Sequence, residues 1–271
     1  MILTNAKIKT LSKLKDRPGR YEQGLFLIEG KRSVMEALDS QLSIELIVTD
    51  ISKASEKFSD VFEAARRKDI MVAELPSTKF RKLETTENSQ GIIAVAKLPD
   101  WSLNQFFLQV KSAENALVIF LDRISDPGNA GAIFRTAEWF GLDAVILSKG
   151  CVDAFNPKVV RSSLSALTRI KVFSDLNFED IWLPLKDSGF EFYCATQENG
   201  ESYVHTSYAK KGVFVFGSEA AGISDEIKSR CTKYVSIPRF GKMESLNVSV
   251  ASGVIISEVI RQRSAKINRQ G

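Results

Sequence analysis

Residues 237–258 read IPRFGKMESLNVSVASGVIISE, and the rest of the chain is organised around this stretch. A short apolar strand at 234–237 leads into a loop with glycine and lysine, and the triplet Ser-Leu-Asn at 245–247 opens a helix. Apolar residues recur at helical spacing over 248–261, which predicts a helix with one apolar face. A strand end, a polar loop and a helix start in quick succession are typical of a binding site.

Two earlier strands end in a similar way. The run ALVIFL at 116–121 leads into a turn at 126–129 and a helix that starts near Ala130 and ends at Gly141. The run VFVF at 213–216 leads into GSEAAGIS. Continuous aliphatic runs suit strands buried on both faces of a parallel sheet, and strand–helix alternation indicates an α/β fold. Neither loop has the GxGxxG spacing of a dinucleotide site or the Lys-Ser/Thr pair of a P-loop.

The first hundred residues form a separate α/β pattern. Four strand-like runs alternate with segments of helical spacing, and they lie at 25–28, 44–48, 70–75 and 91–96. This part contains no nucleophile, metal cluster or phosphate loop. The polar, Pro-containing stretch 98–108 is expected to be a linker, which places the domain boundary between about 100 and 114.

Composition sets bounds on the partners of the protein. The 271 residues are 44% hydrophobic and 26% charged, which excludes a disordered chain and suits two domains. The net charge of +4 and the pI near 8.8 permit an anionic partner without requiring one. Basic residues crowd both ends, and solvated termini and phosphate contacts both stay open as readings. These residues are Lys7, Lys9, Lys13, Lys15, Arg17, Arg20, Arg261, Arg263, Lys266 and Arg269.

The cysteines and the hydropathy indicate a compartment. Cys151, Cys194 and Cys231 are far apart and form no CxxC pair, so we expect a reducing, cytoplasmic setting and no metal site. No run approaches the roughly twenty apolar residues of a membrane-spanning helix. The N-terminus lacks the long apolar core of a secretory signal, although a basic organelle transit segment stays an alternative.

Three motifs together resemble one known family. They are Asn129-x-Gly131-x-x-x-Arg135, Gly217-Ser-Glu219-x-x-Gly222, and Ile237-Pro238 followed by Ser245-Leu-Asn-Val-Ser249. In this order, each at a predicted strand end, they resemble the motifs of the SpoU/TrmH family of RNA ribose 2′-O-methyltransferases in the SPOUT superfamily. The resemblance covers about 116–263, and the N-terminal part is similar to the small substrate-binding domain of many members.

The resemblance implies a fold that spacing alone does not reveal. It implies an α/β architecture in which residues 114–271 form a SpoU-type methyltransferase domain, with a parallel sheet whose C-terminal segment makes a trefoil knot. Knots are very rare in proteins, so general topology rules alone would not predict one here. Residues 1–105 are expected to form a small α/β RNA substrate-binding domain. Family members act as homodimers, with the last helix in the interface.

The resemblance also implies a cofactor and site residues. The cofactor is S-adenosyl-L-methionine, and Gly217, Ile237, Leu246 and Thr196 are expected to line its pocket. The expected catalytic group consists of Arg135, Ser245, Asn247, Asn129 and Glu219. Arg135 either activates the ribose hydroxyl as a base or clamps a phosphate and stabilises the developing alkoxide. Ser245 and Asn247 orient the ribose or Arg135, while Asn129 and Glu219 brace the loops.

Several functions stay open at this point. Ribosomal RNA is the preferred substrate, by analogy, because a separate N-terminal domain is present. A transfer RNA 2′-O-methyltransferase and a non-catalytic RNA-binding protein on the same fold are the alternatives. A Rossmann-type oxidoreductase is a further alternative, which the absence of GxGxxG argues against.

Overall fold

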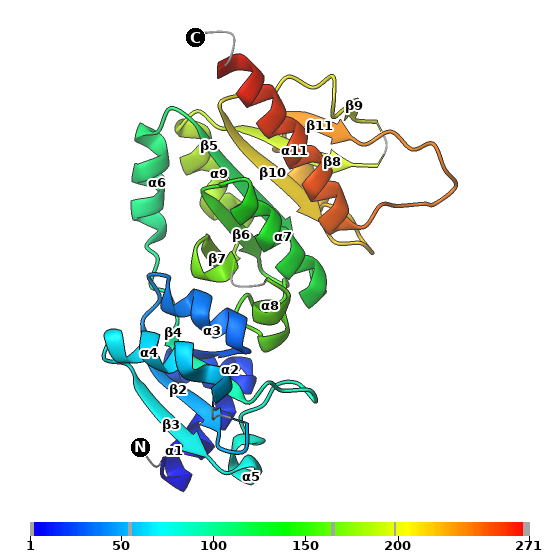
Figure 1. The fold of residues 1–271 in the computed structure, drawn as a ribbon. Coiled ribbons are helices and arrows are strands. Elements are labelled where there is room, and N and C mark those ends of the chain that lie inside the picture. Colours follow the sequence, from blue (N-terminus) through cyan, green and yellow to red (C-terminus); the bar gives the residue numbers. More distant parts are fainter. Residues whose placement is uncertain (1–2, 54–55, 164–165, 198, 268–271) are drawn as a thin grey trace. The chain divides into compact units, whose positions relative to one another are not determined.

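The computed structural model describes residues 3–53, 56–163, 166–197 and 199–267. It contains two compact units (Figure 1): residues up to 100 together with 153–169, and 101–152 together with the chain from 170 onward. Each unit is described by itself. The division into domains at 1–105 and 114–271 stays a prediction, as does the role of Arg269, which lies outside the described residues.

The first unit is built on a four-stranded sheet. The strand order is β1-β4-β2-β3, with β4 antiparallel to β1 and β2, and β3 parallel to β2. All four strands lie where the apolar runs predict them. The strands are β1 Leu25–Glu29, β2 Ile44–Asp50, β3 Met71–Leu75 and β4 Ile92–Lys97. The helices are α1 Asn5–Ser12, η1 Lys13–Lys15, α2 Arg17–Gln23, α3 Lys31–Leu38, η2 Glu56–Phe58, α4 Ser59–Arg67, α5 Ser77–Phe80, α8 Pro157–Ser162 and η3 Ala166–Thr168.

The second unit contains a seven-stranded sheet. Its order is β7-β6-β5-β10-β8-β11-β9, and every neighbouring pair is parallel, which confirms the predicted α/β class. The strands are β5 Ala116–Asp122, β6 Ala144–Ser148, β7 Lys171–Leu176, β8 Glu191–Thr196, β9 Glu201–Ser202, β10 Lys211–Gly217 and β11 Lys233–Ser236. The helices are α6 Leu103–Ser112, α7 Pro127–Trp139, α9 Phe178–Asp187, α10 Asp225–Lys228 and α11 Val248–Ile267. The trefoil knot stays a prediction.

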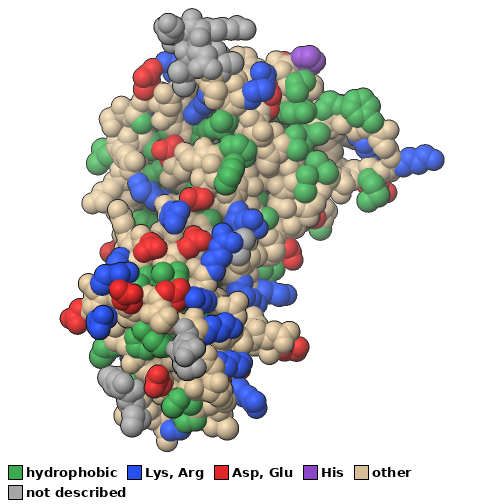
Figure 2. Space-filling view, in the orientation of Figure 1, with side chains coloured by type: hydrophobic (Ala, Val, Ile, Leu, Met, Phe, Trp, Pro, Cys, Tyr) green, Lys and Arg blue, Asp and Glu red, His purple; other side chains and the backbone are tan. Residues whose placement is uncertain are grey.

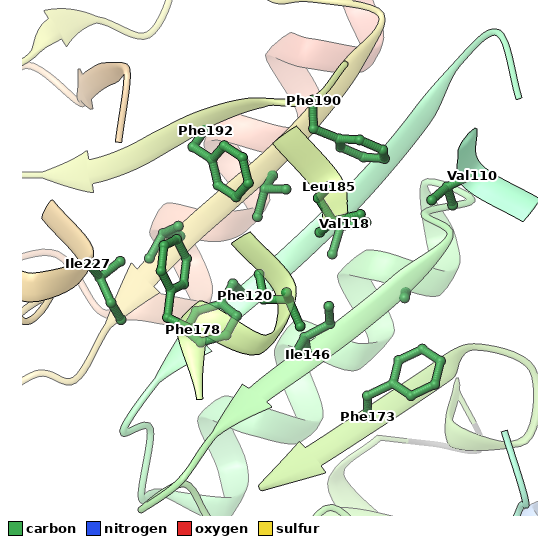
Figure 3. Packing of buried hydrophobic residues seen from close by; sticks show 14 of the residues in the cluster. Val110, Val118, Phe120, Ile146, Phe173, Phe178, Leu185, Phe190, Phe192 and Ile227 are labelled. Carbon is green, nitrogen blue, oxygen red and sulfur yellow. The ribbon is translucent and has the colours of Figure 1, made fainter. Parts of the chain in front are cut away.

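Both faces of this sheet are covered by helices. All seven residues of β5 are buried, and alternate ones such as Val118 and Phe120 join a cluster with Phe178 and Leu185 of α9 (Figure 3). Helices α6 and α9 lie on that face, and α7 and α11 pack together on the other (Figure 1). Two covered faces explain why the central strands read as continuous apolar runs rather than as alternating ones.

Two expectations about local structure are wrong. Residues 103–112, which overlap the expected linker, form α6, and its Phe106 and Val110 are buried in the core of the second unit. The turn expected at 126–129 is the start of α7. The Asp126 carboxylate caps that helix by accepting a hydrogen bond from the Asn129 amide at 2.7 Å, and proline occupies the first turn, where its missing N–H is harmless.

The cysteines also differ from expectation. Cys194 on β8 and Cys231, just before β11, form a disulfide with their Cα atoms 6.0 Å apart. Strands β8 and β11 pair in parallel, which brings together two residues that sequence spacing kept apart. Cys151 is free. Among the described residues, no helix combines the length and hydrophobicity needed to cross a bilayer.

Candidate active site

A pocket of about 850 Å³ lies where strands β8, β10 and β11 end and α11 begins. This size suits a cofactor. The end of parallel strands is also where α/β folds bind ligands. The pocket has an apolar side, which includes Phe216, Ile223 and Ile255, and a polar rim formed by the loops at 217–222 and 237–247.

The four residues expected to hold the cofactor all line this pocket. Thr196 ends β8, Gly217 ends β10, Ile237 follows β11, and Leu246 lies just before α11. Leu246 keeps 48% of its surface exposed although it borders the pocket. The structure therefore brings these positions together from four separate parts of the chain.

Glycine is required at two places in the second motif. A Cβ atom on Gly217 would lie 2.2 Å from the carbonyl carbon of Gly222, so any side chain would push the loop apart. Gly222 has a φ of +63°, in the left-handed region that other residues rarely adopt. The tight turn between them is closed by a bridge from Ser218 to Gly222. The need for glycine at both positions therefore comes from closing this turn.

A side-chain network joins the three motifs. The Nδ2 group of Asn129 on α7 donates a hydrogen bond to the Glu219 carboxylate, and the Nδ2 group of Asn247 donates to Asn129 Oδ1 at 3.0 Å. Asn129 therefore links the loop after β10 to the start of α11. These contacts match the bracing roles predicted for Asn129 and Glu219, although the catalytic roles of all five residues stay predictions.

Asn247 has a second task as the cap of α11. Its Oδ1 atom accepts hydrogen bonds from the Ser249 amide at 2.9 Å and from the Ser249 hydroxyl at 2.6 Å. A side-chain oxygen at this position satisfies amide groups that the first helical turn leaves without partners. The Asn and the second Ser of the third motif thus fix the point where the helix begins.

The remaining predicted residues, Ser245 and Arg135, are exposed. Ser245 lines the pocket and makes no hydrogen bond with the described residues. Arg135 lies on α7, outside the pocket lining, and has neither an ion pair nor a hydrogen bond from its side chain within the described part of the chain. Both side chains are thus available to a substrate.

The structure adds two residues that sequence reasoning missed. Asp122, buried at the end of β5, pairs with Arg123 at 3.0 Å and accepts a hydrogen bond from the Ser224 amide at 2.8 Å. Arg123 also donates to the Gly222 carbonyl at 3.2 Å and has a φ of +56°, which is strained for arginine. The hydrogen bond with Asp122 raises the pKa of Arg123. The available signal was a charged pair directly after a buried strand.

No group of three or more His, Cys, Asp or Glu residues is placed to hold a metal ion in the described part of the chain. Among the described residues that interact with Arg123, Cys151 also has an altered pKa. Burial raises the pKa of its thiol, which donates to the Leu121 carbonyl at 3.3 Å.

Comparison with known proteins supports one family. The profile of the SpoU rRNA Methylase family matches residues 116–257, and that of the MRM3-like substrate binding domain matches residues 5–94. The chain is 32% identical over 253 residues to the 23S rRNA (guanosine(2553)-2′-O)-methyltransferase RlmP of Bacillus subtilis, covering 93% of this chain and 95% of that protein.

Solved structures agree with this assignment. A putative RNA methyltransferase of the TrmH family from Porphyromonas gingivalis has 31% identity and a TM-score of 0.81, over 97% of this chain and 100% of that one. The SpoU methyltransferase AviRb from Streptomyces viridochromogenes, determined in complex with the cofactor AdoMet, shares the fold with a TM-score of 0.84 at 24% identity, over 96% and 98% of the two chains. The chain belongs to the SpoU rRNA methylase family.

Proposed function

We propose that this protein transfers a methyl group from S-adenosyl-L-methionine to a ribose 2′-hydroxyl in ribosomal RNA. The observation that carries the proposal is the network in which Asn129 joins Glu219 to Asn247 at the rim of the pocket. It assembles all three motifs of the family into one site. The curated relative from Bacillus subtilis, which matches over nearly its whole length, is named as a ribosomal RNA 2′-O-methyltransferase.

The pocket fits the proposed cofactor in size and chemistry. Its volume of about 850 Å³ leaves room for a nucleoside with an amino-acid tail. Exposed apolar side chains such as Leu246 and Met243 offer a surface for a purine, and Glu244 and Glu219 offer carboxylates to cationic groups. Thr196, Gly217, Ile237 and Leu246 would hold the cofactor. S-adenosyl-L-methionine supplies a methyl group that its sulfonium makes electrophilic.

The residues at the rim then act on the ribose. When the hydroxyl oxygen bonds to the methyl carbon, the bond from that carbon to sulfur would break and leave a neutral thioether. The hydroxyl would lose its proton in the same step, so negative charge would develop on its oxygen. A guanidinium stays protonated in proteins, so we assign Arg135 to stabilising this charge and binding the adjacent phosphate rather than to taking the proton. Ser245 and Asn247 orient the ribose. The exposed positions of Arg135 and Ser245 give the released proton a path to solvent water.

We also propose that two copies of the chain associate through α7, α11 and the loop before α11. Large apolar side chains are exposed there: Trp139 at 80%, Phe240 at 99%, Met243 at 79% and Val250 at 50%. Exposed apolar groups that gather on one part of a surface are typical of an interface. Sedimentation tests this. Val250→Asp is expected to give monomers, whereas Leu108→Asp on α6, also an exposed apolar site, is expected to leave the dimer intact.

Ribosomal RNA and the cytoplasm are the substrate and compartment that we propose. In a reducing compartment most protein disulfides do not persist, so the Cys194–Cys231 bond would form there only reversibly. Mass spectrometry of protein alkylated inside cells tests the compartment. Full blocking of both cysteines is expected, and complete protection of the pair would contradict it.

The enzymatic proposal is tested with purified full-length protein, labelled S-adenosyl-L-methionine and unmodified RNA. We expect label in large-subunit ribosomal RNA, recovered as a 2′-O-methyl nucleoside after complete digestion. Label on a base, or binding of NAD instead of S-adenosyl-L-methionine, would contradict the proposal. Label in transfer RNA alone would select the transfer RNA alternative, and RNA binding without any transfer would select the non-catalytic one.

A further inference from the structure

The net charge of the protein lies entirely in its first unit. Residues 1–100 and 153–169 contain 20 Lys and Arg against 16 Asp and Glu, a surplus equal to the +4 of the whole chain. The second unit carries 17 of each sign. Figure 2 shows Lys and Arg side chains grouped along one side of the first unit, with few acidic side chains among them. A partner with negative charge is therefore attracted to this unit.

A cleft of about 530 Å³ in the first unit gathers part of this charge. It shares no residue with the active-site pocket. Its lining combines four cations with polar and acidic groups from η1, the segment after α5, and α8. These residues are Lys15, Arg81, Glu84, Thr85, Thr86, Glu87, Asn156, Pro157, Lys158 and Arg161.

Three of the four cations in this cleft form no hydrogen bond or ion pair through their side chains with the described residues. Within the described part of the chain, Lys15, Arg81 and Lys158 make no side-chain hydrogen bond or ion pair, although Glu84 and Glu87 line the same cleft. Burial lowers the pKa of Lys15, and the attraction of Glu29 and Glu84 opposes this without cancelling it. Cations held together without partners repel one another, and a bound anion would relieve that repulsion.

The fourth cation is held rigidly by the floor of the cleft. Arg161 Nη1 donates to the Thr85 hydroxyl at 2.8 Å, and that hydroxyl donates in turn to the buried carboxylate of Glu29. Glu29 also accepts from the Thr85 amide at 3.0 Å and from the Thr86 hydroxyl at 3.4 Å. Nε and Nη2 of Arg161 make no hydrogen bond with the described residues, so the guanidinium can still donate to a ligand.

A buried ion pair holds the two sides of the cleft together. Arg20, which is 1% exposed, donates from Nε to the Asp153 carboxylate at 3.0 Å, just ahead of α8. Arg20 Nη1 also donates to the carbonyls of Leu14 at 2.9 Å and Lys15 at 2.8 Å. The backbone that carries Lys15 is thereby fixed to the segment that carries Lys158. The cleft is thus a prebuilt structure and not a chance grouping of mobile surface lysines.

We propose that this cleft binds the phosphodiester backbone of the RNA substrate, with Lys15, Arg81, Lys158 and Arg161 contacting phosphates. Planar guanidinium groups and lysine ammonium groups suit phosphate oxygens. Glu84 and Glu87 offer acceptors to ribose hydroxyls, which RNA carries beside each phosphate. The inference rests on the proposed function, because it takes RNA as the substrate.

The test uses the full-length double variant Arg81→Ala/Lys158→Ala. Neither side chain has a hydrogen bond or ion pair with the described residues, so their removal takes no such contact from the fold. The matched control is Arg66→Ala/Lys111→Ala, which removes one Arg and one Lys that are exposed, lack such contacts and lie outside the cleft. The probe is an unmodified transcript of large-subunit ribosomal RNA.

We expect the cleft variant to raise the KM for RNA on the order of tenfold. The slope of log affinity against log salt should fall by about 1.4 to 1.8, as for two lost phosphate contacts. The kcat at saturating RNA and the affinity for S-adenosyl-L-methionine should not change. Wild-type slope and KM in the cleft variant, or an equal effect in the control, would overturn the inference. Absence of methyl transfer by the wild type would instead refute the proposed function.

Discussion

Replacing Asn129 by alanine tests the network that joins the three motifs. The change removes the hydrogen bond donated to Glu219 and the one accepted from Asn247. A neutral hydrogen bond contributes about 0.5 to 1.5 kcal/mol and one to a carboxylate about 1.5 to 3 kcal/mol. Because Asn129 is half-buried and both partners are exposed, we take the lower end, about 2 kcal/mol for the two together.

This energy should appear in catalysis more than in stability. If the network holds the loops in the arrangement needed for the transition state, 2 kcal/mol corresponds to about a 30-fold loss in kcat/KM. The unfolding midpoint should move little, because alanine is a good helix former at this position in the first turn of α7. The assay is initial-rate methyl transfer at RNA concentrations below KM, with Asn104→Ala on α6 as an exposed control that loses no hydrogen bond.

A double-mutant cycle separates bracing from a general loss of structure. Asn129→Ala and Asn247→Ala remove the same hydrogen bond, so the double variant should be less impaired than the product of the two single effects. Asn129→Asp should be worse than Asn129→Ala, because it places a second carboxylate beside Glu219. Strictly multiplicative effects, or wild-type kcat/KM in Asn129→Ala, would refute the reasoning.

Four further outcomes are expected. Arg135→Ala should abolish methyl transfer and leave the affinity for S-adenosyl-L-methionine nearly unchanged, as measured by single-turnover kinetics and calorimetry; unchanged turnover would remove Arg135 from the mechanism. Gly217→Ala should lower stability by about 1 to 3 kcal/mol in denaturant titration, because its Cβ would meet the Gly222 carbonyl carbon at 2.2 Å. The control is Gly253→Ala in α11, whose Cβ meets no atom closer than 4.0 Å, and this change should be neutral or stabilising. Burial raises the pKa of the Asp50 carboxyl, but hydrogen bonds from Ser77 and Ser52 outweigh it and lower that pKa below its usual 3.8. The stability that Asp50 contributes is therefore present above the unfolded pKa and is lost as the pH falls through the folded pKa. The wild type should lose stability faster than Asp50→Asn in titrations from pH 5 to 3, and parallel curves would contradict this. The oxidised protein should be about 3 to 4 kcal/mol more stable than the reduced one, because the Cys194–Cys231 bond closes a loop with a sequence separation of 37. The measurement is denaturant unfolding with and without reductant in a Cys151→Ser background. Superimposable unfolding curves would count against a formed bond.

The sequence predicts the elements whose signals are local. The runs at 116–121 and 213–216 are strands because consecutive aliphatic residues can be buried only where both sheet faces are covered. The helix predicted over 248–261 forms and extends to Ile267. The nine predicted site positions could be placed because their motifs fix residue order. Seven of them line one pocket, while Asn129 and Arg135 lie outside its lining, and their roles stay predictions.

Other features depend on distant parts of the chain, so their local sequence signals are weak or absent. Helix α6 overlaps a stretch whose Pro99 and polar residues predict a linker, although Phe106 and Val110 fill a place in the core. The disulfide depends on the pairing of β8 with β11, which spacing does not reveal. Arg123 acts through Asp122 and the Gly222 carbonyl, and its importance follows only once the loop at 218–224 is folded back over β5.

The grouping of residues 153–169 with the first hundred has a consequence for evolution and engineering. The first compact unit is encoded in two pieces, and the second piece lies in the chain between β6 and β7 of the seven-stranded sheet. A fragment cut at residue 100 would keep Arg20 and lose Asp153, and an arginine left buried without its partner costs about 3 to 5 kcal/mol. A chimera of two relatives joined at residue 100 therefore has to match Arg20 from one parent with an acidic partner at 153 from the other, and a mismatched chimera should unfold at lower denaturant concentration.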